Sequence, residues 1–298
     1  MIPLKDNIPT TRFPLVTVLL IVVNLVFFGW QLTYSGDRSE DRELRALGIT
    51  DADLNAIEYG AIPYRILRGG GDCAVGAVPR EGKRPRADIV CEGTPAYRDA
   101  QELEEDGVAP FVPVATAAWF LTIFTSMFMH GGILHIVGNL LFLWVFGNNI
   151  EDAMGRWRFL AFYLLAGLVA VFAQAALETS STLPTIGASG AVSGVLGGYI
   201  LLHPRARVLT MVIIIFFFTF IEIPAMIMLG IWFALQALPA FGELATPDLA
   251  GADGGVAYLA HIGGFLFGLA TIKLFANRYK GPKGAATPPP TAPAPAVG

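Results

Sequence analysis

Residues 187–202 read GASGAVSGVLGGYILL, an apolar run with small residues at four-residue intervals. Gly190, Gly194 and Gly198 would share one face of a helix, because residues at i and i+4 lie one turn apart. Small residues at this spacing are typical of helices that pack closely against a neighbour inside a membrane. The stretch therefore predicts a membrane-spanning helix in close contact with another helix, with Ser189 near its start.

The composition of the whole chain also indicates a membrane protein. Of its 298 residues, 54% are hydrophobic and 15% are charged, and the mean hydropathy is +0.58, whereas soluble domains carry about 25% charged residues. The net charge of -4 offers no basic surface for phosphate backbones, so nucleic acid is a poor candidate partner. The lipid bilayer is the expected environment, and we predict no cofactor and no metal ion.

Further hydrophobic segments on both sides of this run predict an all-α polytopic membrane protein with six spanning helices. A helix rises about 1.5 Å per residue, so roughly 20 apolar residues cross the hydrocarbon layer. The predicted spans are 13–34, 133–150, 157–177, 188–202, 207–236 and 256–276, with 114–129 as a membrane-associated approach. A signal peptide is the rival interpretation of the first segment, but no small-residue cleavage pattern follows it.

The short loops predict the orientation of these spans. Lys and Arg near span ends are held on the cytoplasmic side, and all four clusters fall on one side of a six-span arrangement: Lys5 and Arg12, Arg156 and Arg158, Arg205 and Arg207, and Lys273 to Lys283. The loops at 178–187 and 239–255 contain neither residue type. We therefore expect a plasma-membrane protein with a cytoplasmic N-terminus (1–12) and a disordered, Pro- and Ala-rich cytoplasmic tail (279–298).

Residues 35–110 form a polar insert that we place outside the cytoplasm, before a core of five further helices at 111–278. A short exposed helix is possible at 37–45. Cys73 and Cys91 both lie in this insert. They could form a disulfide in an oxidising compartment, or remain two free thiols.

Strongly polar side chains inside the spans are costly, so each one suggests a functional site. Six such residues stand out: His130, His135, Asn139, Ser189, Glu222 and His261. Glu222 belongs to the fifth predicted span, which Pro224 is expected to kink.

Four of these polar groups can meet at one depth. Ser189 and His261 each lie near the start of a span that begins outside, and His135 and Asn139 share a helical face near another outside start. A serine hydroxyl beside an imidazole is the minimal activated nucleophile for acyl transfer. His135 and Asn139 could donate hydrogen bonds to the resulting oxyanion.

Together these residues resemble the rhomboid family of intramembrane serine proteases. The resemblance covers residues 112–276 and rests on four ordered motifs: His130-x4-His135-x3-Asn139, Gly147-x3-Glu151-x3-Gly155, Gly187-Ala188-Ser189-Gly190 and Ala260-His261-x2-Gly264.

The resemblance implies a rhomboid-like six-helix bundle that cleaves single-span membrane proteins in or near their transmembrane segments. It implies Ser189 as nucleophile, His261 as general base, and an oxyanion hole of His135, Asn139 and the Ser189 backbone N–H. His130, Gly187 and Gly190 would lie near the site, and Glu151 would be structural. Span five and the loop at 239–255 would form the mobile side.

The sequence departs from the family pattern at Ser193, where some members place an aromatic ring that packs on the catalytic histidine. Something else must therefore orient His261. Val256 stands where a glycine is expected, four residues before Ala260.

Two other functions remain as alternatives. A rhomboid-like pseudoenzyme would bind membrane helices without cleaving them, although such relatives typically lack the serine or the histidine. A transporter or proton relay that uses an intramembrane histidine and Glu222 would predict charged pairs or inverted repeats between the two halves, and the sequence contains no evident repeat.

Overall fold

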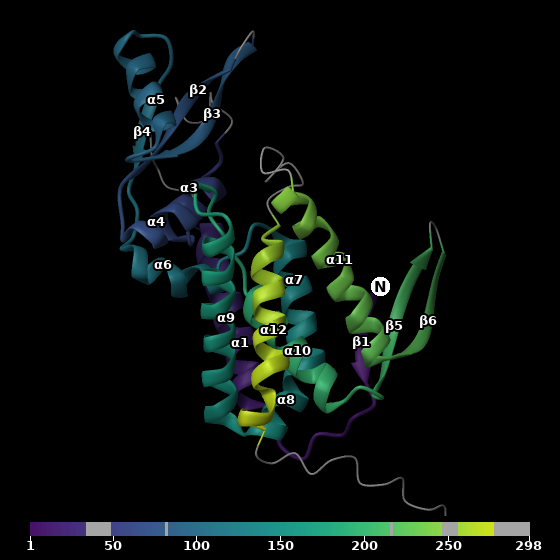
Figure 1. The fold of residues 1–298 in the computed structure, drawn as a ribbon. Coiled ribbons are helices and arrows are strands. Elements are labelled where there is room, and N and C mark those ends of the chain that lie inside the picture. Colours follow the sequence, from purple (N-terminus) through teal and green to yellow (C-terminus); the bar gives the residue numbers. More distant parts are fainter. Residues whose placement is uncertain (34–48, 81–82, 215–216, 246–255, 277–298) are drawn as a thin grey trace, which may run out of the picture.

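The computed structural model describes residues 1–33, 49–80, 83–214, 217–245 and 256–276. Its main body is a bundle of helices, with a smaller lobe of helices and strands at one end (Figure 1). The bundle contains α1 (Leu15–Thr33), α7 (Ile133–Phe142) continued by the π-helical η2 (Leu143–Gly147) and by α8 (Asn148–Met154), α9 (Arg156–Leu177), α10 (Ser189–Leu202), α11 (Ala225–Ala245) and α12 (Tyr258–Phe275).

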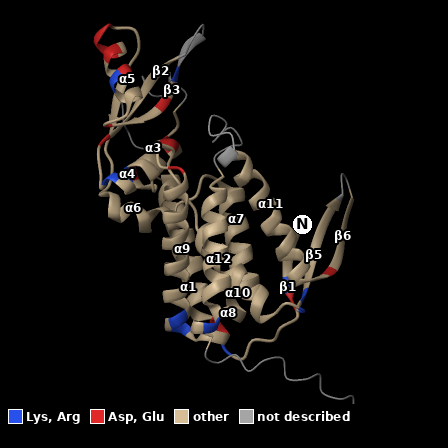
Figure 2. Ribbon diagram, in the orientation of Figure 1, with Lys and Arg blue, Asp and Glu red and all other residues tan. Residues whose placement is uncertain are grey.

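Five helical segments of the described chain are long and apolar enough to cross a membrane. They are Leu15–Thr33, Ile133–Met154, Arg156–Leu177, Ala225–Gly242 and Tyr258–Phe275. Charged residues are sparse along the middle of the bundle and more frequent at its lower end and in the lobe (Figure 2). These features confirm the prediction of a mostly helical, polytopic membrane bundle.

The sixth apolar helix, α10, is short and central. Its 14 residues correspond to about 21 Å of helix, less than the ~30 Å of a hydrocarbon layer. Most of its side chains are buried among the other helices. Because α10 is too short to reach both membrane surfaces, its first residue, Ser189, can lie below the surface of the bilayer.

Glycines make the contact between α10 and α12 possible. A Cβ atom on Gly264 would collide with the carbonyl oxygen of Gly190, and one on Gly268 would collide with that of Gly194. The predicted close approach of small-residue helix faces is thereby confirmed.

The prediction of a fifth membrane span at 207–236 is wrong for the first half of that segment. The chain there forms a hairpin of β5 (Arg207–Ile214) and β6 (Phe217–Pro224), and β5 also pairs antiparallel with β1 (Ile2–Asp6), in the order β1-β5-β6. The run of β-branched and aromatic residues from 212 to 223 suits a strand as well as a membrane helix, so hydropathy alone did not separate the two.

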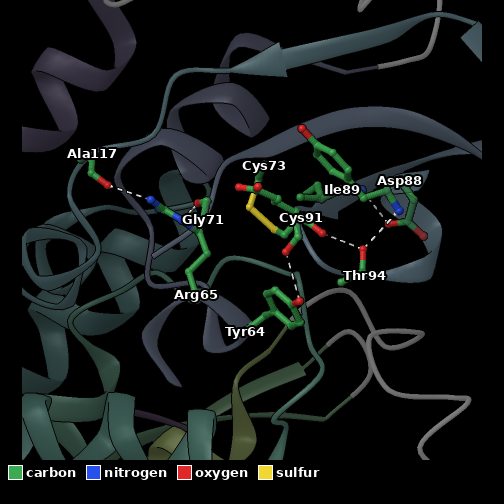
Figure 3. Close-up of a disulfide and its surroundings, with 11 residues drawn as sticks. Tyr64, Arg65, Gly71, Cys73, Asp88, Ile89, Cys91, Thr94 and Ala117 are labelled. Carbon is green, nitrogen blue, oxygen red and sulfur yellow. Dashed lines mark hydrogen bonds between the residues drawn. A yellow bond between two sulfur atoms is a disulfide. The ribbon is translucent and has the colours of Figure 1, made fainter. Parts of the chain in front are cut away.

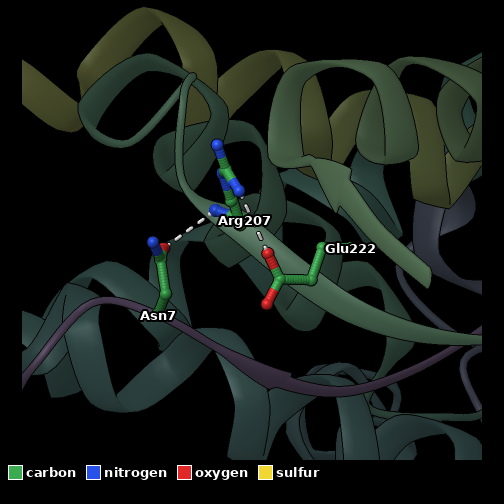
Figure 4. A network of polar contacts seen from close by, with 3 residues as sticks. All are labelled: Asn7, Arg207 and Glu222. Atoms are coloured by element: carbon green, nitrogen blue, oxygen red, sulfur yellow. Dashed lines mark hydrogen bonds and ion pairs between the residues drawn. The ribbon is translucent and has the colours of Figure 1, made fainter. Parts of the chain in front are cut away.

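This hairpin also corrects the predictions for Glu222 and Pro224. Glu222 lies on β6, where its carboxylate pairs with Arg207 at 3.4 Å, and both side chains are exposed (Figure 4). Pro224 ends the strand directly before α11 and kinks no helix. The helix α11 then continues through Pro239 to Ala245, so the predicted loop at 239–255 begins later; residues 246–255 lie outside the described residues.

Asp6 anchors the N-terminal strand to the bundle. Its carboxylate accepts hydrogen bonds from the Tyr199 hydroxyl on α10 and from the Asn149 side-chain amide on α8. Burial raises the pKa of the Asp6 carboxyl group. The base of α11 is thus held through β6, β5 and β1 to the rest of the bundle.

The polar insert folds into the lobe. It contains α3 (Asp51–Tyr59), α4 (Pro63–Arg68), β2 (Cys73–Arg80), β3 (Lys83–Cys91), α5 (Pro95–Glu105) and β4 (Phe111–Val114), with the strands in the antiparallel order β3-β2-β4. Because β4 pairs with β2, the lobe extends to Val114, beyond the predicted boundary at 110. The proposed short helix at 37–45 lies outside the described residues.

A disulfide joins Cys73 and Cys91, which face each other on β2 and β3 and are both buried (Figure 3). The sequence left open a disulfide or two free thiols, and the structure contains the disulfide. It closes a loop of the lobe with a sequence separation of 18 residues.

Glu151 caps the first membrane helix from another segment of the chain. Its buried carboxylate accepts hydrogen bonds from the backbone N–H groups of Val16 and Thr17 at 3.0 and 2.8 Å, and from the Thr17 hydroxyl at 2.9 Å. The first N–H groups of a helix have no partner within the helix. These contacts support the structural role that the family resemblance implied.

We predict that Glu151→Ala destabilises the protein by about 2 kcal/mol or more, because it leaves buried donors without acceptors. Thermal unfolding of the purified protein in detergent would measure the loss. Asp152→Ala is the matched control, since among the described residues the neighbouring carboxylate accepts hydrogen bonds from exposed Thr11 alone, and it should change stability by less than about 0.5 kcal/mol. Equal stability of the two variants would contradict the capping role.

Candidate active site

Ser189 and His261 lie within hydrogen-bonding distance. Ser189 is the first residue of α10 and His261 lies in the first turn of α12, and the serine Oγ is 2.7 Å from the histidine Nε2. The close approach of these two helices at their glycines places the side chains together. The structure therefore brings together the two residues that the sequence singled out as a nucleophile and a base.

Two further hydrogen bonds fix the backbone on either side of this pair. The buried side-chain oxygen of Gln174, on α9, accepts a hydrogen bond from the Ala260 N–H at 2.9 Å, which holds the start of α12. The Gly187 N–H donates to the Ser126 carbonyl at 2.8 Å, which holds the loop before α10. Both ends of the Ser189–His261 contact are thus anchored to other parts of the fold.

The second nitrogen of His261 contacts a residue that the sequence reasoning missed. Its Nδ1 lies 2.8 Å from Oε1 of Gln236 on α11, and the ring of Trp232, one turn earlier on α11, lies 6.0 Å from the imidazole ring. These two residues contact the imidazole from α11. The Ser193 hydroxyl instead donates to the Ser189 carbonyl at 2.6 Å. Gln236 carried only a weak signal in the sequence, since it is a polar amide but the last residue of the predicted span 207–236.

His135 lines the same pocket as this pair and lies beside Gly187. A Cβ atom on Gly187 would lie 2.8 Å from Nε2 of His135 and 3.4 Å from the Ser189 hydroxyl, and Gly187 has a φ of 124°. The Gly131 N–H donates to Nδ1 of His135 at 3.4 Å. This contact favours the tautomer with its proton on Nε2, the nitrogen that faces Gly187. Gly187 therefore provides space where His135 and Ser189 approach one another.

Asn139 adds a second donor on the same helix. Its side chain is 8% exposed, and its buried Nδ2 finds no acceptor among the described residues. A buried donor without a partner is costly, so the amide is available to a bound group. Asn139, His135, Ser189 and His261 all line one cavity of about 970 Å³.

The other two predicted neighbours of the site have packing roles. His130 is buried behind His135, with ring centroids 5.2 Å apart, and does not line the cavity. Gly190 does line the cavity, and a Cβ atom there would collide with Ala170 on α9. Among the residues that the structure describes, no cluster of three His, Cys, Asp or Glu side chains could hold a metal ion.

The lobe reaches the rim of the cavity. Asp53 and Ala56 of α3 line it together with the active-site residues. Backbone hydrogen bonds join Ala61 and Thr185 in both directions, at 3.1 and 2.9 Å, and the Tyr64 N–H donates to the Ser181 carbonyl at 3.0 Å. The loop that leads to Gly187 and Ser189 is therefore directly attached to the lobe.

The family of the chain follows from comparison with known proteins. The rhomboid domain family matches residues 117–278, which include His135, Asn139, Ser189 and His261. The chain belongs to the rhomboid family, whose members are intramembrane serine proteases in general.

Several curated relatives share this region. The chain is 30% identical over 149 residues to "Presenilin-associated rhomboid-like protein A, mitochondrial" of Danio rerio, covering 48% of this chain and 34% of the relative. It is 30% identical over 153 residues to "Rhomboid protein 1, mitochondrial" of Saccharomyces cerevisiae, covering 50% and 40%. It is 33% identical over 133 residues to "Rhomboid protease GluP" of Bacillus subtilis, covering 44% and 24%. The matches thus span well under half the length of these relatives.

Proposed function

We propose that this protein is an intramembrane serine endopeptidase that hydrolyses peptide bonds in or near the transmembrane segments of single-span membrane proteins. The observation that carries the proposal is the 2.7 Å contact between the Ser189 hydroxyl and Nε2 of His261, inside a cavity at the end of the helix bundle that adjoins the lobe. Family membership and the relative named as a protease support the same chemistry.

The proposed reaction begins with attack of the Ser189 Oγ on the substrate carbonyl carbon while His261 Nε2 takes the hydroxyl proton. The carbonyl oxygen becomes an oxyanion, which accepts hydrogen bonds from His135 Nε2–H, from Asn139 Nδ2–H and from the Ser189 backbone N–H. The imidazolium then gives its proton to the leaving amine, and the peptide bond breaks to leave an acyl-enzyme. His261 takes a proton from water as the water attacks the ester carbon. The bond between that carbon and the Ser189 Oγ then breaks, His261 returns the proton to the Oγ, and the carboxylic acid product leaves.

The architecture also supports a proposal for topology. We place residues 1–12 and 279–298 in the cytoplasm, residues 13–34 in the first span, the lobe on the opposite side, and the catalytic core after the lobe, within 115–278. Positive residues at the cytoplasmic ends of the spans support this orientation, and the disulfide supports an oxidising compartment for the lobe. Several relatives are named as mitochondrial, so the expectation of a plasma membrane has no support from them.

The decisive experiment compares Ser189→Ala with the wild type on a panel of single-span reporter proteins in liposomes. We expect the wild type to cleave a reporter and to react with a fluorophosphonate, and Ser189→Ala to do neither. Ser181→Ala, in the loop before the site, is the matched control and should retain both activities. Unchanged cleavage by Ser189→Ala would exclude this nucleophile, whereas reporter binding without cleavage or labelling by either form would favour a pseudoenzyme.

A further inference from the structure

We infer that Gln236 is a positioning residue, which holds the His261 imidazole in its reactive tautomer and makes catalysis depend on the position of α11. The inference rests on the proposed function and extends the serine–histidine pair to a third, uncharged member. It is carried by the contacts on the two sides of the Gln236 amide.

The first step is the direction of the amide. Gln236 Nε2 lies 3.5 Å from the Trp232 carbonyl oxygen, one helical turn earlier, and can only donate to it. In this orientation the amide oxygen, Oε1, lies 2.8 Å from His261 Nδ1. An amide oxygen can only accept a hydrogen bond. His261 therefore carries its proton on Nδ1.

The second step is the consequence for the other ring nitrogen. In a neutral imidazole with its proton on Nδ1, Nε2 has a lone pair and can accept a proton. That nitrogen faces the Ser189 hydroxyl at 2.7 Å. Gln236 thus selects the tautomer in which His261 can act as a base. After proton transfer, the same amide oxygen continues to accept the Nδ1–H hydrogen bond of the imidazolium.

An amide suits this place better than a carboxylate. The Gln236 side chain lies within an apolar membrane helix, where an ionised group is costly. Among the described titratable side chains, His135 is the one whose charge would act on His261. No described acid forms a hydrogen bond with the imidazole. The glutamine provides the orienting acceptor without placing a charge in the bundle.

The third step concerns the element that carries the glutamine. Trp232 and Gln236 both project from α11 toward His261, while Leu235 and Leu238 of the same helix are exposed, at 57% and 69%. One face of α11 therefore covers the site and another faces away from the bundle. A displacement of α11 that separates Gln236 from His261 would leave the imidazole without its tautomer-selecting partner.

The test compares two substitutions in the full-length protein. Gln236→Met has a similar size but cannot accept a strong hydrogen bond, and should lower kcat roughly tenfold or more with little change in KM. Gln236→Glu keeps an acceptor and should retain more kcat than Gln236→Met at alkaline pH. Because a carboxylate stabilises the imidazolium, the acidic limb of its pH–rate profile should move to higher pH.

Leu235→Ala is the matched control, because it shortens an exposed neighbour on the same helix. It should leave both kcat and the pH profile unchanged. If Ser189-dependent cleavage proceeds equally in the wild type and Gln236→Met, the positioning role is wrong while the proposed function stands. If the Met and Glu variants lose the same activity with the wild-type pH profile, Gln236 is merely structural and the inference fails.

A spectroscopic readout tests the tautomer independently of proteolysis. The chain has four histidines, so ¹⁵N NMR of histidine-labelled protein can assign the ring nitrogens one by one. We expect His261 with its proton on Nδ1 in the wild type and a mixture of tautomers in Gln236→Met. A single unchanged tautomer in both proteins would overturn the inference even if no substrate were found.

Discussion

His261→Ala is expected to lower cleavage of a single-span reporter, and the rate at which Ser189 reacts with a fluorophosphonate, by about 10³-fold or more. The structural reason is that Nε2 of His261 is 2.7 Å from the serine hydroxyl and is the proton acceptor for that hydroxyl in the proposed reaction. Initial cleavage rates in liposomes and labelling rates in detergent would measure the two losses separately.

His203→Gln is the control for this prediction. His203 follows α10 at the end opposite Ser189, so its replacement should leave labelling close to the wild-type rate. Thermal unfolding should show that His261→Ala remains folded. A folded His261→Ala protein that labels as fast as the wild type would exclude His261 as the base.

Asn139→Leu should lower kcat by about 10²-fold or more and change KM little. Leucine has nearly the shape of asparagine but no donor, so the variant removes the hydrogen bond to the oxyanion without opening a cavity. The buried Nδ2 has no acceptor among the described residues, as expected for a donor that acts only when negative charge develops on a substrate. Steady-state kinetics with a cleavable reporter would give kcat and KM.

The thermal stability of the Asn139→Leu protein is the control for this prediction. Since the wild-type donor is buried without a partner in this structure, its removal should not destabilise the fold, and the thermal midpoint should stay equal or rise. Full kcat in Asn139→Leu would show that Asn139 plays no part in the oxyanion hole. A fall in both kcat and thermal stability would assign the residue a packing role instead.

The bundle and the main polar residues of the cavity could be predicted from sequence because their signals are local. Hydropathy identified most of the helices, and the glycine spacing of α10 predicted its close contact with another helix. The rarity of polar groups in apolar spans singled out Ser189 and His261. Counting spans placed these two residues at one depth, which the 2.7 Å contact agrees with.

The remaining features depend on contacts between distant segments. The apolar run after Arg207 looked like a membrane helix, but it pairs with the N-terminal strand, a partner about 200 residues away. The role of Gln236 depends on the packing of α11 against α12, which no local pattern encodes. The sequence analysis described the lobe only as a polar insert. Its small core is formed by short strands and helices around one disulfide, and such short elements produce no long hydrophobic pattern.

The attachment of the lobe to the loop before Ser189 has a mechanical consequence. Force applied to the lobe is transmitted to the loop before Ser189 through direct backbone hydrogen bonds, between Ala61 and Thr185 and between Tyr64 and Ser181. The disulfide keeps β2 and β3 from separating under such a load. A force on the lobe would therefore act on the segment that positions Ser189 at the start of α10.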